Sequence, residues 1–188
     1  MIYLLMVLTL VAGLGCPSET QAATQVYFSP KDQVADRLIE RIDKEKQSIR
    51  IAIYCLTHSG VGRALIRAKK RGVSIEVIVD PFSVKNRTPL ARLAREGIPI
   101  YVWDPVRTPE EQEKYPRGSL MHDKFCIFGK ENVWTGSFNF TNTANNVNQE
   151  NVVVLDEADV VAAFQAQFAR IKKEGCRSYA EFVANKKK

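Results

Sequence analysis

Three short segments in the second half of the chain carry side chains suited to chemistry on a phosphodiester. They are His122-Asp123-Lys124, Gly136-Ser137-Phe138-Asn139 and Gln149-Glu150-Asn151. Alternate side chains of a strand share a face, so His122 lies on the face of Lys124, and Ser137 on that of Asn139. An imidazole can attack phosphorus, while an ammonium, a hydroxyl and a carboxamide hold the oxygens where negative charge grows. If the two strands are neighbours, this spacing predicts a phosphodiesterase site.

Taken alone, a His-x-Lys pair fits a polar strand surface, and only the joint spacing of the three segments favours a site. No cluster of metal ligands accompanies them. Asp80, Asp104 and Asp156 each end a predicted strand, where aspartates commonly cap a helix or a turn. We therefore expect no metal at the site.

The elements that position these residues alternate between strand and helix periodicity. Strands are predicted at Gln25–Ser29, Ile49–Leu56, Val73–Asp80, Ile98–Trp103, Leu120–Phe128, Asn132–Ser137 and Asn151–Leu155. Helices are predicted at Asp32–Lys46, Val61–Lys70, Pro89–Arg95, Val160–Lys173 and Tyr179–Val183. This rhythm indicates a single α/β domain, a mixed β-sheet flanked by helices on both faces.

The segment Asp104–Ser119 interrupts the rhythm. Its prolines and its glycine, set among charged residues, are typical of a loop. A loop of this length inside a compact domain is often functional. Because it leads directly into the strand that carries His122, we expect it to border the cleft.

Residues 1–23 differ from the rest of the chain. Met1 to Gly15 carry no charged side chain, and the small-residue run Thr20-Gln21-Ala22-Ala23 follows. The apolar stretch is short for a membrane span, so we expect an exported protein, periplasmic or secreted, whose signal peptide is residues 1–23 and whose catalytic domain is residues 24–188. Two alternatives stay open: a start without Lys or Arg fits an uncleaved membrane anchor, and Cys16 fits a lipidation site.

The composition is that of a soluble globular protein, with 45% hydrophobic and 26% charged residues, which excludes a disordered or fibrous class. All 27 Lys and Arg lie after residue 23, together with 20 of the 21 acids, so the mature domain has a net charge of +7. This surplus suits a polyanion such as nucleic acid, and equally an acidic membrane surface. Cys55 and Cys126 lie in apolar runs and are expected in the core, and no C-x-x-C pair suggests zinc.

The three segments together resemble the motifs of the phospholipase D superfamily, His-x-Lys-x4-Asp followed by Gly-Ser-x-Asn. The similarity extends over essentially the whole mature chain. It is greatest to small bacterial endonucleases with one motif per chain and to their mitochondrial relatives. The resemblance implies a phospholipase D-like fold and a phosphodiesterase that needs no cofactor and stays active in EDTA.

The resemblance also implies a role for each motif position. His122 would be the nucleophile that forms a phosphohistidine, and Lys124 and Asn139 would bind the phosphate oxygens. Ser137 would support that pocket. Glu150 would accept a hydrogen bond from the far ring nitrogen of a catalytic histidine and so fix its tautomer.

One position departs from the motif, because Gly129 stands where the family has Asp. The resemblance implies that this Asp has a structural or supporting role, so we expect the protein to keep its catalytic activity without it. The effect of Gly129 on rate and on stability is left open, and an inactive protein is the alternative. Asp123 should face away from His122 and is a poor substitute.

The mechanism needs two groups on opposite sides of the phosphorus, one to attack and one to protonate the leaving oxygen and then activate water. His58 is the one other histidine, and it lacks the Lys and Asn companions. We therefore predict a two-fold homodimer in which each copy contributes His122 to a shared site, where the two imidazoles titrate as a coupled pair.

Nucleic acid, with single strands favoured and little sequence specificity, is the expected substrate, mainly because of the resemblance to nonspecific nucleases. His58, Trp103 and Arg117 are the candidates for substrate contact, with an ordinary surface role as the alternative for each. Further residues suited to backbone contacts or base stacking are Lys69, Lys70, Arg71, Lys85, Arg87, Arg92, Arg95, Tyr101 and Tyr115. A phospholipase, which would want an apolar entry surface, and a noncatalytic nucleic-acid-binding protein stay open as alternatives.

Overall fold

The computed structural model describes residues 24–84, 88–115 and 118–186. The predicted signal peptide, residues 1–23, lies outside the described residues, as do Lys85, Arg87 and Arg117. No helix in the described ranges is long and apolar enough to cross a membrane.

One mixed sheet forms the centre of the domain, with eight strands among the described residues in the order β1-β7-β6-β5-β2-β3-β4-β8. β2, β3 and β4 are parallel, and the other neighbours pair antiparallel. The strands are β1 (Gln25–Ser29), β2 (Ser48–Ile53), β3 (Ser74–Val79), β4 (Ile100–Trp103), β5 (Lys124–Phe128), β6 (Asn132–Gly136), β7 (Glu150–Leu155) and β8 (Cys176–Ser178).

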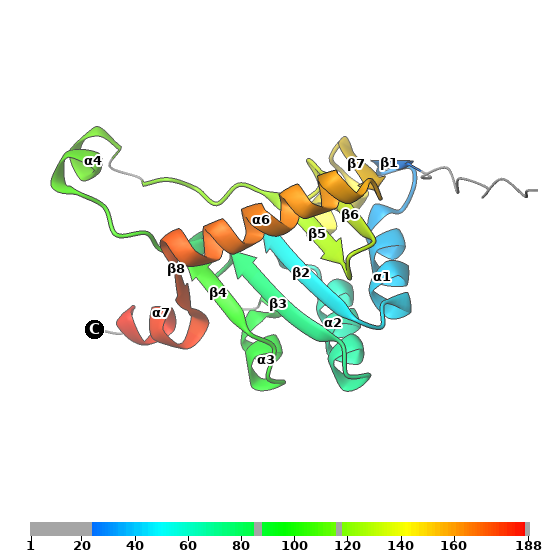
Figure 1. Ribbon diagram of the computed structural model, residues 1–188, viewed down its shortest axis with the longest axis horizontal. Coiled ribbons are helices and arrows are strands. Elements are labelled where there is room, and N and C mark those ends of the chain that lie inside the picture. Colours follow the sequence, from blue (N-terminus) through cyan, green and yellow to red (C-terminus); the bar gives the residue numbers. More distant parts are fainter. Residues whose placement is uncertain (1–23, 85–87, 116–117, 187–188) are drawn as a thin grey trace, which may run out of the picture.

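Helices cover both faces of this sheet (Figure 1). One core lies between the sheet and α1 (Val34–Lys44), α2 (Ser59–Lys70) and α3 (Leu90–Arg95), and α7 (Tyr179–Asn185) joins it through Phe182. The second core lies under α6 (Ala158–Gly175), which crosses the opposite face. The pleat divides the strands between the two cores, since Ile51 belongs to the first core and Ala52 to the second. The predicted α/β architecture is confirmed.

Several elements differ from the sequence prediction. The strand predicted over Leu120–Phe128 starts only at Lys124, so His122 precedes β5. The predicted loop contains a short helix, α4 (Pro109–Lys114). A capping box between Thr108 and Glu111 begins this helix, and none of its residues is buried. The short elements α5 (Asn142–Asn146) and β8 were missed, because five and three residues give no periodic signal.

Candidate active site

The motif residues lie where several strands end at one edge of the sheet. β5 begins at Lys124, which pairs with Ile53 at the end of β2. β6 ends at Gly136, and β7 begins at Glu150. Because β5 is antiparallel to both β2 and β6, and β7 is antiparallel to β6, the starts of β5 and β7 meet the ends of β2 and β6. The topology gathers the three motif segments at this edge.

His122 and Lys124 are in direct contact at the site. The Lys124 Nζ lies 3.1 Å from His122 Nδ1 and donates to the His122 carbonyl oxygen at 2.6 Å. Burial lowers the pKa of Lys124, against the attraction of the Asp123 and Glu150 carboxylates. An ammonium has no lone pair, so Nδ1 accepts in this contact and the neutral ring carries its proton on Nε2.

Tyr54, directly after β2, packs against both of these side chains. Its ring centroid lies 4.5 Å from that of His122, and the Lys124 Nζ lies 5.3 Å from it. Phe82 stacks on Tyr54 at 5.2 Å. Desolvation, with the negative charge of Asp80, raises the pKa of Tyr54, so the phenol stays neutral. Tyr54 was not predicted as part of the site, because the strand predicted over Ile49–Leu56 includes it, whereas β2 ends at Ile53.

Asp80 holds the segment that leads to His122. Its side chain is buried, with one oxygen accepting from the Phe82 amide at 2.8 Å and the other from the Met121 amide at 3.0 Å. The cap predicted for a strand-end aspartate is therefore present. The bond to Met121 adds a long-range link that the sequence did not indicate.

The Gly136-Ser137 step is fixed by the close approach of β7. A Cβ on Gly136 would lie 2.1 Å from the Asn151 carbonyl oxygen, which no side chain tolerates. Ser137 Oγ donates to Glu150 Oε2 at 2.6 Å and accepts from the Asn151 amide at 3.1 Å. Asn148 Nδ2 donates to Glu150 Oε1 at 2.9 Å.

The expected bond from Glu150 to a catalytic histidine is not made within one chain. Both carboxylate oxygens of Glu150 are engaged by Ser137 and Asn148, while Lys124 contacts the far ring nitrogen of His122. Glu150 thus supports Ser137 here.

Asn139 presents an unfilled hydrogen-bonding position. Phe138 and Phe140 bury their rings in the core, so the alternation of the segment turns Ser137 and Asn139 the other way. The Asn139 Oδ1 is buried and has no hydrogen-bond partner within the described part of the chain. A carboxamide oxygen can only accept, so the group that Asn139 can offer to the oxygens of a phosphate is its NH2 group.

His58 has a structural task next to the motif. Its Nδ1 accepts from the Val61 amide at 3.2 Å as the N-cap of α2, and its amide donates to the Phe140 carbonyl oxygen. Half-burial lowers the pKa of His58, which favours the neutral ring that a cap requires. The structure does not bring this ring together with His122 in any contact between described residues.

Gly129 lies at the opposite end of β5 from Lys124, roughly 17 Å away at strand rise. Its φ of +57° places it in the left-handed region of the turn to β6, and Glu45 and Gln47 are its nearest side chains. The departure from the motif therefore touches no site residue. Asp123 accepts from Gln167 of α6 and lines the same cavity as His122.

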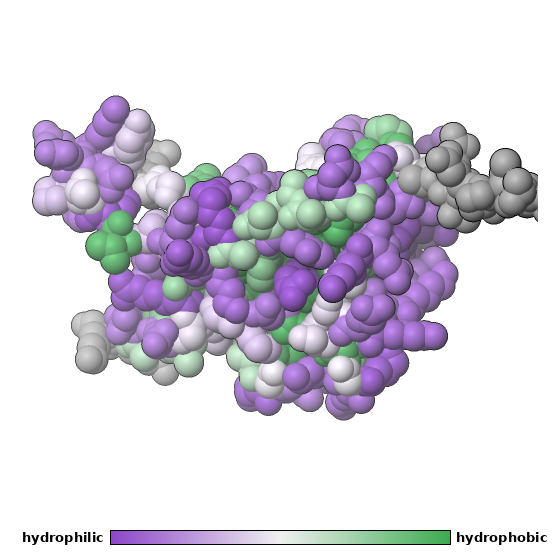
Figure 2. Space-filling model, in the orientation of Figure 1, coloured by the Kyte–Doolittle hydropathy of each residue, from purple (hydrophilic) through white to green (hydrophobic). Residues whose placement is uncertain are grey.

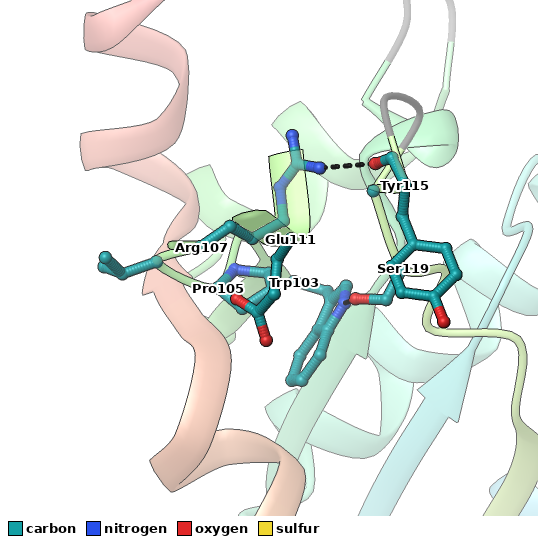
Figure 3. Close-up of a pocket in the computed structure, with 8 residues that line it drawn as sticks. Trp103, Pro105, Arg107, Glu111, Tyr115 and Ser119 are labelled. Atoms are coloured by element: carbon teal, nitrogen blue, oxygen red, sulfur yellow. Dashed lines mark hydrogen bonds between the residues drawn. The ribbon is translucent and has the colours of Figure 1, made fainter. Parts of the chain in front are cut away.

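Two cavities adjoin the site and share Trp103. One, of about 310 Å³, is lined by Trp103, Leu120, Met121, His122, Asp123, Gln167, Arg170 and Ile171. The other, of about 360 Å³, lies between β4 and α4, as Figure 3 shows. The cluster Lys69 to Arg71 instead lies at the far end of α2, and Arg71 is bonded to α1, so these cations do not flank His122. Among the described residues, no three His, Cys, Asp or Glu side chains form a metal cluster.

Comparison with known proteins agrees with this arrangement. Residues 38–172 match the family described as "Cardiolipin synthase, PLD-like domain". The chain belongs to the phospholipase D superfamily, and it is a hydrolase of phosphodiesterase type.

Two relatives with similar sequences have names that refer to lipid substrates. The phospholipase D of Rickettsia bellii (strain RML369-C) is 30% identical over 146 residues, which cover 77% of this chain and 67% of the relative. The mitochondrial cardiolipin hydrolase of Drosophila melanogaster is 31% identical over 156 residues, covering 72% of this chain and 57% of that one.

Among solved structures, the phospholipase D family member Nuc from Salmonella typhimurium is 31% identical with a TM-score of 0.69, over 85% of this chain and 99% of that one. NucT from Helicobacter pylori shares the fold, with 20% identity and a TM-score of 0.74 over 85% of this chain and 100% of its own.

Proposed function

We propose that this protein is a nuclease that hydrolyses single-stranded nucleic acid at a site shared by two subunits, without a metal. The observation that carries the phosphodiester chemistry is the contact between Lys124 Nζ and His122 Nδ1, at the edge of the sheet where Ser137 and Asn139 follow β6. Cation, imidazole and carboxamide together match one phosphate group.

In the first step, His122 Nε2 attacks phosphorus and the bond to the leaving oxygen breaks, while the partner's His122 gives that oxygen a proton. In the second step, the partner's His122 takes a proton from water, whose oxygen displaces His122 from the phosphohistidine. A bound phosphate draws the Lys124 ammonium away from His122 Nδ1. The ring proton then passes from Nε2 to Nδ1, which leaves the Nε2 lone pair free to attack. The proton that Nδ1 carries during attack then needs a carboxylate acceptor, and Glu150 of either subunit is the candidate.

The need for a second subunit follows from what surrounds His122. In the described part of the chain, its ring contacts are Lys124 and Tyr54, and the pKa of Tyr54 is raised, which makes it a weak acid for this purpose. His58 is engaged as a helix cap. A second His122 across a two-fold axis supplies the missing acid.

The choice of substrate rests on charge and on polar groups in the cavities. The net charge of +6 for the whole chain suits a polyanion, and the cavity walls carry Arg107, Glu111 and Arg170. A phospholipase is the second candidate. An apolar entry surface was not expected from the sequence, yet Val106, Tyr115 and Leu120 are exposed near the site, and Figure 2 shows a hydrophobic area on the segment between β4 and α4.

The decisive experiment compares wild type with His122→Ala in EDTA. Single-stranded DNA, single-stranded RNA, phosphatidylcholine and cardiolipin are the substrates, and Lys130→Ala, an exposed turn variant, is the control. We expect cleavage of nucleic acid by wild type and by the control, and a loss of about 10³-fold or more in His122→Ala. Cleavage of lipid alone would overturn the nuclease proposal, and activity abolished by EDTA would overturn the metal-independent mechanism.

Export is a separate part of the proposal, and it rests on the apolar start of the sequence. Cell fractionation followed by mass spectrometry of the isolated chain tests it. We expect a periplasmic or secreted protein that begins at Ala23 or Thr24.

A further inference from the structure

We propose that the cavity between β4 and α4 is a nucleobase subsite, in which the Trp103 indole stacks on a base of the same strand whose phosphodiester lies at His122. The inference rests on the proposed function and extends it, because it says how the substrate is held away from the reacting phosphate.

Trp103 connects the two cavities. It lines the cavity that contains His122, and it also lines the one enclosed by the loop around α4. The indole is thus the side chain that a molecule with its phosphate at His122 would meet on the side of the loop cavity. At about 360 Å³ the loop cavity is in the size range of small-ligand sites.

The indole is held in a fixed position. Trp103 Nε1 donates to Ser119 Oγ at 3.2 Å. A Cβ on Gly175 would lie 2.5 Å from the Trp103 ring, so the end of α6 packs directly against the indole. A ring fixed in this way loses little conformational freedom when a flat ligand stacks on it.

The loop that encloses the cavity is closed by its own contacts. Arg107 Nη1 donates to the Tyr115 carbonyl oxygen at 2.7 Å, which links the two sides of the loop (Figure 3). The Trp103 indole, the Tyr115 ring and the Arg107 side chain surround one hollow in this view. Tyr115 is 56% exposed, so its ring is available to a ligand.

The chemistry of the wall favours a base over an acyl chain. Aromatic rings and a guanidinium offer flat surfaces for stacking, and Glu111 and Ser119 offer hydrogen-bonding groups to the edge of a base. Arg107 and Glu111 are bonded to backbone groups of Tyr115 and Thr108. An acyl chain would cover these two charged side chains without adding a hydrogen bond to either, which is unfavourable. Among the residues that the structure describes, the lining of this cavity holds one cation, Arg107, which suits a phosphate that flanks the base, and one acid, Glu111.

Tryptophan fluorescence gives a direct test. The chain has two tryptophans, and Trp134 is 1% exposed, so Trp103 is the one that a ligand can touch. The full chain with His122→Ala binds without turnover. The probes are oligothymidylate, an abasic oligonucleotide of the same length and charge, and vesicles of phosphatidylcholine with cardiolipin. We expect oligothymidylate to quench Trp103 emission and the abasic strand to leave it nearly unchanged.

A second experiment measures the steady-state kinetics of Trp103 variants in which His122 is retained. Trp103→Ala should raise KM for single-stranded DNA about 10-fold, with little change in kcat, and should not alter KM for the abasic strand. Trp103→Phe, which keeps a ring, should recover most of the affinity and serves as the control for folding.

Every other outcome of these experiments either overturns the base subsite or supports it. Equal quenching by the abasic strand, no quenching by any probe, or an emission shift caused by vesicles alone overturns the base subsite. Emission that depends on protein concentration without ligand shows that a second copy covers Trp103, which also overturns it. Base-dependent quenching in a protein that cleaves no nucleic acid supports the subsite while the proposed nuclease function fails.

Discussion

The Asp80 carboxylate accepts a hydrogen bond from the Met121 amide at 3.0 Å, which ties the end of β3 to the residue before His122. The carboxylate is 2% exposed, and its other oxygen accepts from the Phe82 amide. One buried side chain thus sets the position of the catalytic candidate and of the ring that stacks on Tyr54.

Asp80→Asn should act on turnover through this position. A carboxamide can accept only one of the two bonds, and its NH2 group then opposes an N–H, at a cost of about 1–3 kcal/mol in stability. We expect kcat to fall about 10- to 100-fold with KM little changed, because small misplacements of a reacting group have effects of that size.

Asp104→Asn is the matched control for this variant, since Asp104 also follows a strand but its ion pair with Arg177 is exposed to solvent. Steady-state kinetics and thermal unfolding check both variants. An unchanged kcat in a destabilised Asp80→Asn protein would mean that Asp80 serves the fold alone.

Subunit mixing tests the shared site. If each site needs His122 from both copies, chains with His122→Ala poison the wild-type chains with which they pair. Activity per wild-type chain should then fall in proportion to the wild-type fraction after the subunits exchange. Mixing with Lys130→Ala chains should cause no loss. Full activity per wild-type chain in the His122→Ala mixture contradicts the shared site.

The alkaline limb of the pH profile should belong to Lys124. Burial lowers the pKa of Lys124 from its ordinary 10.5, so the ammonium is lost at a lower pH than that of an exposed lysine. Activity should fall as pH rises, with a midpoint below 10.5. In Lys124→Arg this limb should vanish, because guanidinium stays protonated, although the rate will be lower. The profile of kcat/KM from pH 6 to 10.5, which reports the free enzyme, measures it, and the same limb in the Arg variant would exclude Lys124.

Gly129→Asp, which restores the family motif, should leave turnover unchanged within about 2-fold, because a misplacement must reach the reacting group to matter. The left-handed φ of +57° is tolerated by Asp and Asn at a cost of about 1 kcal/mol. The Glu45 carboxylate lies 3.7 Å from the new Cβ, so Asp should destabilise the protein more than Asn does. Thermal unfolding compares the two variants, and a large gain in kcat would show that position 129 does act on the site.

The sequence predicted where the main strands lie along the chain, because β-branched runs are local signals. The two-residue repeats also predicted that the motif side chains gather, provided that their strands are neighbours. It did not predict that β5 begins after His122, since the pattern of Leu120 to Phe128 is equally apolar on both sides of that point. Asp80 and Tyr54 were missed as parts of the site because their contacts with Met121 and His122 span more than 40 residues. Such contacts depend on strand order, which local patterns do not encode.

Gly136 shows that residues of one sequence motif can be required for different reasons, some for the fold and others for catalysis. Its backbone lies against the Asn151 carbonyl so tightly that any side chain would push β7 aside, whether or not the protein ever meets a phosphate. A descendant that had lost all turnover would still be held to glycine at this position by its architecture, while Lys124 would be free to drift. Glycine in the second motif is therefore a signature of the fold, and the lysine is the better indicator of an active enzyme.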